Sequence, residues 1–302
     1  MKRRIKPWLL WPNRHGEDET VPVTGMLYNF CYNLLCILPL AGRAQRRYTG
    51  TNLLHKAVKY MKLWQGVVLG VVYLFVGYAV ALCLSMPRDV SSLLFVSALT
   101  LVLAVVLLGI APPADWRALF RVRKPLLGWT LVLLAAQLLV MQISVVLGVW
   151  FASDKVSSTF LNGPMPFQML AIALLGPIDE ELIFRGGLTQ GLCARIHWKA
   201  GIVIPAVLFM LGHYWTQIPQ TLIFGLLLGY LCWYTGSIAY GIILHVLFNA
   251  SAFLNFSGYP LLAWNPVAGT VLLLLITAAG LALTLWGLRG FTRCADRLAA
   301  QP

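Results

Sequence analysis

Three groups of polar side chains interrupt the apolar sequence, and their residue types are those that acid–base chemistry uses. A carboxylate or an imidazole can act as a general base. An ionisable residue at the centre of a membrane helix costs about 2.5 to 3.5 kcal/mol, so a set of them indicates a functional site. The candidates are Glu180, Glu181, Arg185, His213, His245 and Asn249.

Helical geometry separates the two glutamates of the stretch GPIDEELIFRGGL. Glu181 and Arg185 are four residues apart and share a helix face, so they can neutralise each other. Glu180 lies about 100° around the helix from Glu181 and about 140° from Arg185. It is left without an obvious local partner, which makes it the candidate general base. Asp179 could merely face water in a cavity, and we assign it no role.

The spacing also predicts that the polar groups lie at one depth. Glu180 is 15 residues before the basic loop 195–199 and His213 is 14 residues after it, so in an antiparallel hairpin both lie about 21 Å from that loop. His245 and Asn249 share one face of a third helix, about 14 to 20 Å from the same side. Three helices therefore bring polar groups to one layer.

Several of these residues also have simpler interpretations. A single histidine in a membrane helix often only hydrogen-bonds a neighbouring helix, which applies to His213 or His245 alone. The pairing of Glu181 with Arg185 is better explained by structure than by catalysis. The GxxxG spacing from Gly225 to Gly229 indicates close helix packing. The remaining histidines are interpreted as solvated loop residues: His15, His55 and His197.

The elements that must position these residues are membrane helices. Of the 302 residues, 59% are hydrophobic and 11% charged, with a mean hydropathy of +0.78, which is too apolar for an ordinary soluble domain. Charge-free runs of 23 to 29 residues, and one of 89 from Ala200 to Leu288, exceed the roughly 20 residues of a membrane span. We predict an all-α polytopic membrane helix bundle with the active site inside it. About eight transmembrane helices are expected, near 63–87, 91–112, 126–150, 166–192, 200–215, 219–235, 238–256 and 266–288.

The formal net charge is +13, and the basic residues are gathered in alternate loops. The positive-inside rule therefore predicts that both termini are cytoplasmic, and the charge needs no nucleic-acid partner. We expect a cytoplasmic basic segment over 1–62 with a candidate interfacial helix at 26–42, a transmembrane domain over 63–288, and a cytoplasmic basic tail over 289–302. Contact of segment 43–62 with anionic lipids is compatible with this. The six cysteines show no CxxC spacing, so neither a disulfide framework nor a cysteine zinc site is predicted.

With these residues the chain resembles the type II CAAX prenyl endopeptidase family, the group that contains the Ras-converting enzyme and the bacterial bacteriocin-processing and self-immunity proteins. Three motifs carry the resemblance, and it covers a peptidase core of about 165–256. They are EExxxR from Glu180 to Arg185, FxxxH from Phe209 to His213, and HxxxN from His245 to Asn249. Each motif alone is weak, whereas three in order, each within an expected span, are specific.

The resemblance implies an intramembrane glutamate-type endopeptidase. Carried over from the family, Glu180 and His213 activate a water and His245 and Asn249 stabilise the oxyanion, with Glu181 and Arg185 in support. The implied partners are a peptide or protein substrate, which in the family's best-known case is prenylated, and membrane lipids. The implied location is an integral membrane position, the inner membrane if the chain is bacterial.

Three alternatives stay open from the sequence. Zinc could be held by the two histidines and a glutamate, but no HExxH is present and the Asn249 amide is a poor zinc ligand, so we expect no cofactor. A non-proteolytic immunity or scaffold protein of the same fold would have lost a motif residue, and none is lost. A proton-coupled transporter would have broken helices in two symmetric halves, and no such symmetry is seen.

Overall fold

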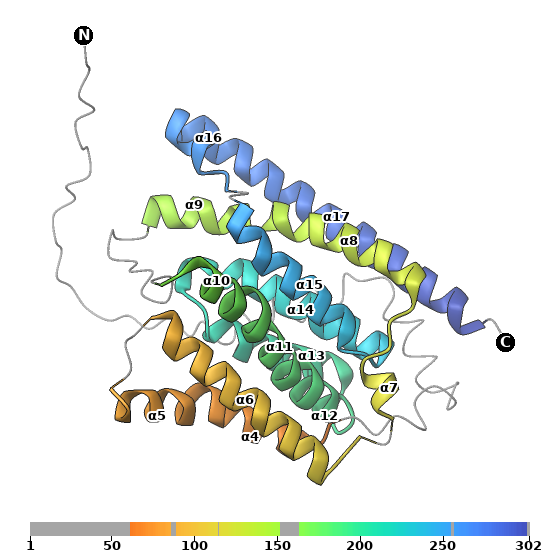
Figure 1. Cartoon of the computed structure of the whole chain (residues 1–302). Coiled ribbons are helices and arrows are strands. Elements are labelled where there is room, and N and C mark those ends of the chain that lie inside the picture. Colours follow the sequence, from red (N-terminus) through yellow and green to blue (C-terminus); the bar gives the residue numbers. More distant parts are fainter. Residues whose placement is uncertain (1–60, 86–88, 114, 152–162, 255–256, 301–302) are drawn as a thin grey trace.

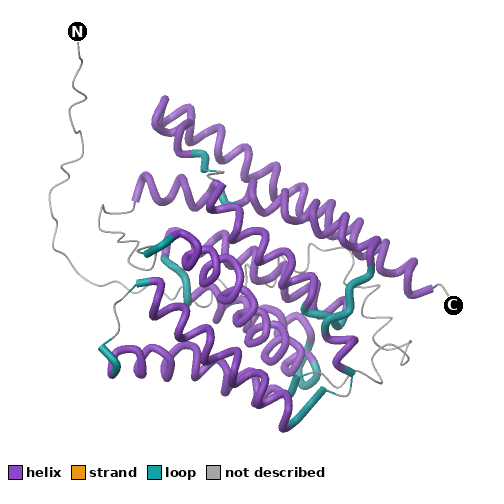
Figure 2. The backbone as a smooth tube through the Cα atoms, viewed as in Figure 1, coloured by secondary structure: helices purple, strands orange, loops and turns teal. Residues whose placement is uncertain are grey.

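The structure is a computed structural model, and it describes residues 61–85, 89–113, 115–151, 163–254 and 257–300. These residues form helices and connecting loops without a strand (Figure 2), which confirms the predicted all-α bundle. The candidate interfacial helix at 26–42 lies outside them. The elements are α4 (Leu63–Val71), η1 (Val72–Val76), α5 (Gly77–Cys83), α6 (Val90–Ile110), α7 (Trp116–Leu119), α8 (Lys124–Val140), α9 (Gln142–Phe151), α10 (Met165–Gln168), η3 (Met169–Leu175), α11 (Gly176–Glu180), η4 (Glu181–Thr189), α12 (Gln190–Cys193), α13 (Trp198–Leu211), η5 (Trp215–Gln217), α14 (Ile218–Thr235), α15 (Ala239–Ser251), η6 (Ala252–Leu254), α16 (Tyr259–Trp264) and α17 (Pro266–Ala300).

The helices are arranged around a central group that carries the candidate site (Figure 1). On one side, α4 and α5 pack against α6, and α4 also packs against η4 of the central group. On the other side, α8 and α17 run side by side in close contact. Between them lie the elements from α10 to α15, which carry the three motifs.

Among the described residues, six helices are long and apolar enough to cross a membrane, fewer than the eight expected. The other two expected spans are also helical, but they differ in composition or length. The helix from α10 to α12 contains four charged residues, and α13 has only 14 residues, less than the roughly 20 of a full span. The count of eight therefore stays a prediction. Among the described residues, the six candidate spans are Leu63–Val80, Val90–Ile110, Lys124–Phe151, Trp215–Thr235, Ala239–Trp264 and Pro266–Ala300.

The last helix is longer than the sequence predicts. We expect span eight to end near 288, whereas α17 continues without a break through 35 residues to Ala300. Such a helix is about 52 Å long, which exceeds the roughly 30 Å hydrocarbon thickness.

The turn after α14 agrees with the expected break at 236–237, because Gly236 has φ 71° and its N–H donates to the Cys232 carbonyl at 2.8 Å. Glycine adopts this left-handed backbone without steric cost.

The bundle has polar contacts inside and apolar side chains outside, as expected for helices in lipid. Gln137 of α8 donates to the Thr284 hydroxyl of α17 at 2.9 Å, and both side chains are buried. Large apolar side chains such as Phe75, Val105 and Leu275 are exposed instead. Because lipid provides no hydrophobic drive between helices, such buried polar contacts and close packing hold the bundle together.

Glycines set two of the closest helix crossings. A Cβ on Gly66 of α4 would lie 2.6 Å from the Gly187 Cα of η4, so the two backbones touch there. A Cβ on Gly225 would lie 3.2 Å from the Ala206 Cα, and one on Gly229 would lie 3.0 Å from the Ile202 side chain. The close-packing interpretation of the GxxxG spacing therefore agrees with the structure.

We expect Gly66→Ala to destabilise the bundle by about 1–3 kcal/mol, because the added methyl group forces two helices apart. The measurement is thermal unfolding of the purified protein in detergent, followed by tryptophan fluorescence. Gly109→Ala is the matched control, since a Cβ on Gly109 meets nothing within 4 Å. Equal unfolding temperatures for the two variants would contradict the close approach of α4 and η4.

Candidate active site

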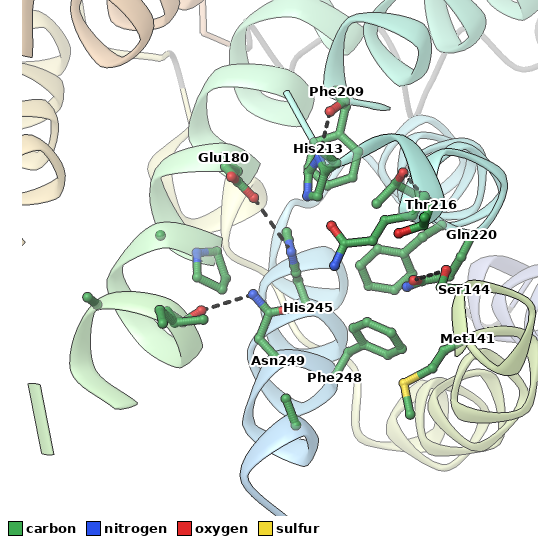
Figure 3. Close-up of a pocket in the computed structure, with 18 of the residues that line it drawn as sticks. Met141, Ser144, Glu180, Phe209, His213, Thr216, Gln220, His245, Phe248 and Asn249 are labelled. Atoms are coloured by element: carbon green, nitrogen blue, oxygen red, sulfur yellow. Dashed lines mark hydrogen bonds and ion pairs between the residues drawn. The ribbon is translucent and has the colours of Figure 1, made fainter. Parts of the chain in front are cut away.

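The four residues expected to do chemistry line one cavity (Figure 3). The cavity has a volume of about 600 Å³, a size typical of ligand-binding pockets. Glu180 comes from α11, His213 from the turn after α13, and His245 and Asn249 from α15. The structure thus brings together side chains that are up to 69 residues apart, counted as 249 minus 180.

The helix that carries Glu180 is locally unwound on both sides of α11. The preceding segment η3 is a π-helix, in which the Gly176 N–H donates to the Ala171 carbonyl five residues earlier. Pro177 has no N–H to continue this pattern, and the Ile172 carbonyl instead accepts from Asn249 Nδ2 at 2.9 Å. The Gly-Pro pair therefore frees a carbonyl that orients a candidate site residue. Such π segments are frequent at functional sites.

Glu181 and Arg185 form the ion pair that their spacing predicts. Arg185 Nη1 lies 3.0 Å from Glu181 Oε1, and the two side chains are only 1% and 0% exposed. The guanidinium carbon is 4.5 Å from the Phe209 ring centroid, and Nη2 donates to the Gly225 carbonyl at 3.4 Å. Neither residue lines the cavity. Their contacts are those of a buried structural pair.

His245 stands between the two glutamates, a contact that the sequence did not predict. Its Nδ1 lies 3.0 Å from Glu181 Oε1, and its Nε2 lies 3.6 Å from Glu180 Oε2. Because a carboxylate only accepts hydrogen bonds, Nδ1 carries the hydrogen and donates to Glu181. This bond fixes the ring so that Nε2 faces the cavity and Glu180.

His213 is oriented by the backbone of its own motif. Its Nδ1 lies 2.9 Å from the Phe209 carbonyl oxygen. A carbonyl can only accept, so Nδ1 carries the hydrogen and Nε2 keeps its lone pair. The half-buried imidazole of His213 therefore offers the cavity a proton acceptor.

Tyr73 also lines the cavity, and no pattern in the sequence predicted this. The Tyr73 hydroxyl lies 3.4 Å from Glu180 Oε1, and the side chain is 9% exposed. Glu180 indeed has no partner on its own helix, but it meets Tyr73 and His245 from two other helices. A single tyrosine in an apolar span is a weak signal, because its polar tip could equally reach a lipid headgroup.

Asp179 does not face water in a cavity, contrary to one expectation. Its side chain is 0% exposed, and Asp179 is absent from the cavity lining.

Zinc would need three or four protein ligands. In the described part of the chain, no group of three or more His, Cys, Asp or Glu side chains is arranged to hold a metal ion. The cofactor-free site stays a prediction.

Comparison with known proteins gives one family model that matches part of the chain. A model of the family described as Type II CAAX prenyl endopeptidase Rce1-like matches residues 162–251. This segment carries all three motifs, so the match confirms the resemblance there. No curated protein and no solved structure gives a significant match. The matched family is one of endopeptidases. Together with the six apolar helices among the described residues, the match supports an integral membrane protein.

Proposed function

We propose that this chain is an intramembrane glutamate-type endopeptidase, which hydrolyses a peptide bond in a membrane-associated or lipid-modified protein or peptide. The observation that carries the proposal is the convergence of Glu180, His213, His245 and Asn249 on one cavity. These residues lie in the segment that matches the protease family. A cavity of this kind can admit water and a stretch of peptide between the helices.

Glu180 and His213 activate the water in this proposal. The water oxygen bonds to the carbonyl carbon while Glu180 takes one of its protons, and the His213 Nε2 lone pair holds the other hydrogen. The same carboxyl group then gives its proton to the leaving nitrogen as the carbon–nitrogen bond breaks. The Tyr73 hydroxyl, 3.4 Å from Glu180 Oε1, holds the carboxylate in place.

His245 and Asn249 stabilise the oxyanion. When His245 is protonated, its Nε2–H can donate to the oxyanion, and Glu181 balances the charge at Nδ1. One N–H of the Asn249 amide is held by the Ile172 carbonyl, so the second is preoriented for donation. Glu181 and Arg185 support the site without touching substrate.

The membrane topology completes the proposal. The basic loops place both termini in the cytoplasm by the positive-inside rule, and membrane lipids surround the exposed apolar side chains. Neither a nucleic-acid partner nor a cofactor is needed for the chemistry described. For a bacterial chain the location is the inner membrane.

Cleavage of peptides by the purified full-length protein tests this function. We expect products detectable by mass spectrometry from wild type, equal rates with and without a chelator such as EDTA, and a loss of products in His213→Ala. Loss of activity with chelator and its recovery with zinc would support the zinc alternative. Peptide binding without any cleavage would support the scaffold or immunity alternative.

A further inference from the structure

The cavity extends well beyond the four proposed catalytic residues. In Figure 3, Thr216, Gln220, Ser144 and Met141 lie on the opposite side of His245 from Glu180. They come from η5, α14, α9 and the residue between α8 and α9. We call this part of the cavity the distal subsite, and define it by Met141, Ser144, Thr216, Gln220, Phe224 and Phe248.

The side-chain amide of Gln220 in the distal subsite is almost buried, and among the described residues only its oxygen has a hydrogen-bond partner. Gln220 is 6% exposed, and its Oε1 accepts from the Ser144 hydroxyl at 3.3 Å. Its Nε2 makes no hydrogen bond to any described residue, although Gln220 lines the cavity. Thr216, also 6% exposed, likewise has no hydrogen-bond partner for its hydroxyl among the described residues. The Gln220 N–H donors and the Thr216 hydroxyl, which can donate or accept, are therefore available to a ligand.

The chemistry of the distal subsite matches an uncharged amide. The carbonyl oxygen of a peptide group or of a Gln or Asn side chain can accept from Gln220 Nε2, and its N–H can donate to the Thr216 hydroxyl. The side chains of Met141, Phe224 and Phe248 provide apolar walls around these groups, as in most ligand sites. A prenyl chain would instead leave the buried donors unpaired, which is unfavourable.

Charge makes an acidic ligand unsuitable. Among the described residues that line the cavity, there is no lysine or arginine, and Glu180 contributes a carboxyl group. Arg185 is buried behind Glu181 and does not line the cavity. A carboxylate in the distal subsite would lose its water without gaining a cation.

We propose that the distal subsite binds an uncharged polar residue of the substrate peptide, close to the bond that is cleaved, and does not hold a lipid chain. This inference rests on the proposed function. It makes Gln220 a specificity-determining residue, and it makes lipid modification unnecessary at this part of the site.

The test uses binding and cleavage as separate measurements on the full-length protein. Fluorescein-labelled ten-residue peptides of one sequence carry Gln, Leu, Glu or S-farnesyl-cysteine at each position in turn. Binding is measured by fluorescence anisotropy in the Glu180→Gln background, which removes the proposed base. At one position we expect the Gln peptide to bind about tenfold more tightly than the Leu peptide, as one to two hydrogen bonds allow.

Gln220→Leu should abolish this tenfold preference, and Thr216→Val, which keeps the side-chain shape, should reduce it about threefold. Gln168→Leu is the control, because Gln168 lies outside the cavity lining. The inference is overturned by a preference that survives in Gln220→Leu, by tightest binding of the farnesylated peptide, or by no binding of any peptide.

The two measurements also separate this inference from the proposed function. Gln220-dependent binding without cleavage by wild type would refute the peptidase and leave the distal subsite standing. If wild type cleaves the peptides and the ratio of KM values for the Gln and Leu peptides is the same in wild type and in Gln220→Leu, the distal subsite is refuted and the peptidase is supported.

Discussion

Replacing Glu180 by glutamine should lower the rate of peptide cleavage by about a hundredfold to ten-thousandfold. The amide has the size of the carboxylate and can still accept from the Tyr73 hydroxyl, so the packing of the cavity is kept. It cannot take a proton from water, and it no longer presents a charge to His245 Nε2 at 3.6 Å. The measurement is the initial rate of product formation from a peptide that wild type cleaves.

Asp179→Asn is the matched control for Glu180→Gln. Asp179 is the neighbouring carboxyl group, but it is fully buried and lies outside the cavity lining, so we expect its rate to stay close to that of wild type. Unfolding temperatures within a few degrees of wild type in both variants would show that the fold is intact. Full activity of Glu180→Gln would remove Glu180 as the base and with it the proposed mechanism.

Arg185→Met should destabilise the protein by about 3–5 kcal/mol, because it leaves the Glu181 carboxylate buried without its cation. Glu181 is 0% exposed and cannot recover its hydration. Methionine keeps much of the apolar stem of arginine, so the loss reports the charge rather than a cavity. The free energy is measured by reversible unfolding of the detergent-solubilised protein in a denaturing detergent.

The double variant Glu181→Gln with Arg185→Met separates charge from packing. We expect it to recover most of the lost stability, since removal of both charges leaves no uncompensated ion in the bundle. Its catalytic rate should be lower than that of wild type, because His245 Nδ1 loses the carboxylate that orients it. A single Arg185→Met variant as stable as wild type would show that the pair contributes nothing.

Much of the fold followed from the sequence because its signals are local. Charge-free runs predicted where the helices lie, and a spacing of four residues predicted the ion pair of Glu181 with Arg185. The depth estimate also placed Glu180 and His213 at one level, and both line the cavity. The number of full spans stays a prediction, because the length between charges does not distinguish a crossing helix from the 14-residue α13.

The contacts that organise the candidate site were not predictable from spacing. His245 meets both glutamates only because α15 is rotated toward η4 and α11, and Tyr73 reaches Glu180 from a helix more than 100 residues earlier in the chain. Helix periodicity fixes which residues share a face, whereas the rotation of one helix against another depends on packing throughout the bundle. The freed Ile172 carbonyl shows the same limit, since periodicity does not reveal a π segment.

The contact between Gly66 and Gly187 limits how far the chain can be shortened at its amino-terminal side. The segment that matches the family model begins at residue 162. Its first helix packs against α4, and the two backbones touch where Gly66 meets Gly187. A fragment of residues 162–251 alone would expose to lipid the helix face that α4 covers, and it would lack Tyr73. We therefore expect the smallest fragment with the proposed activity to begin at residue 63 or earlier, about a hundred residues before the start of the matched segment.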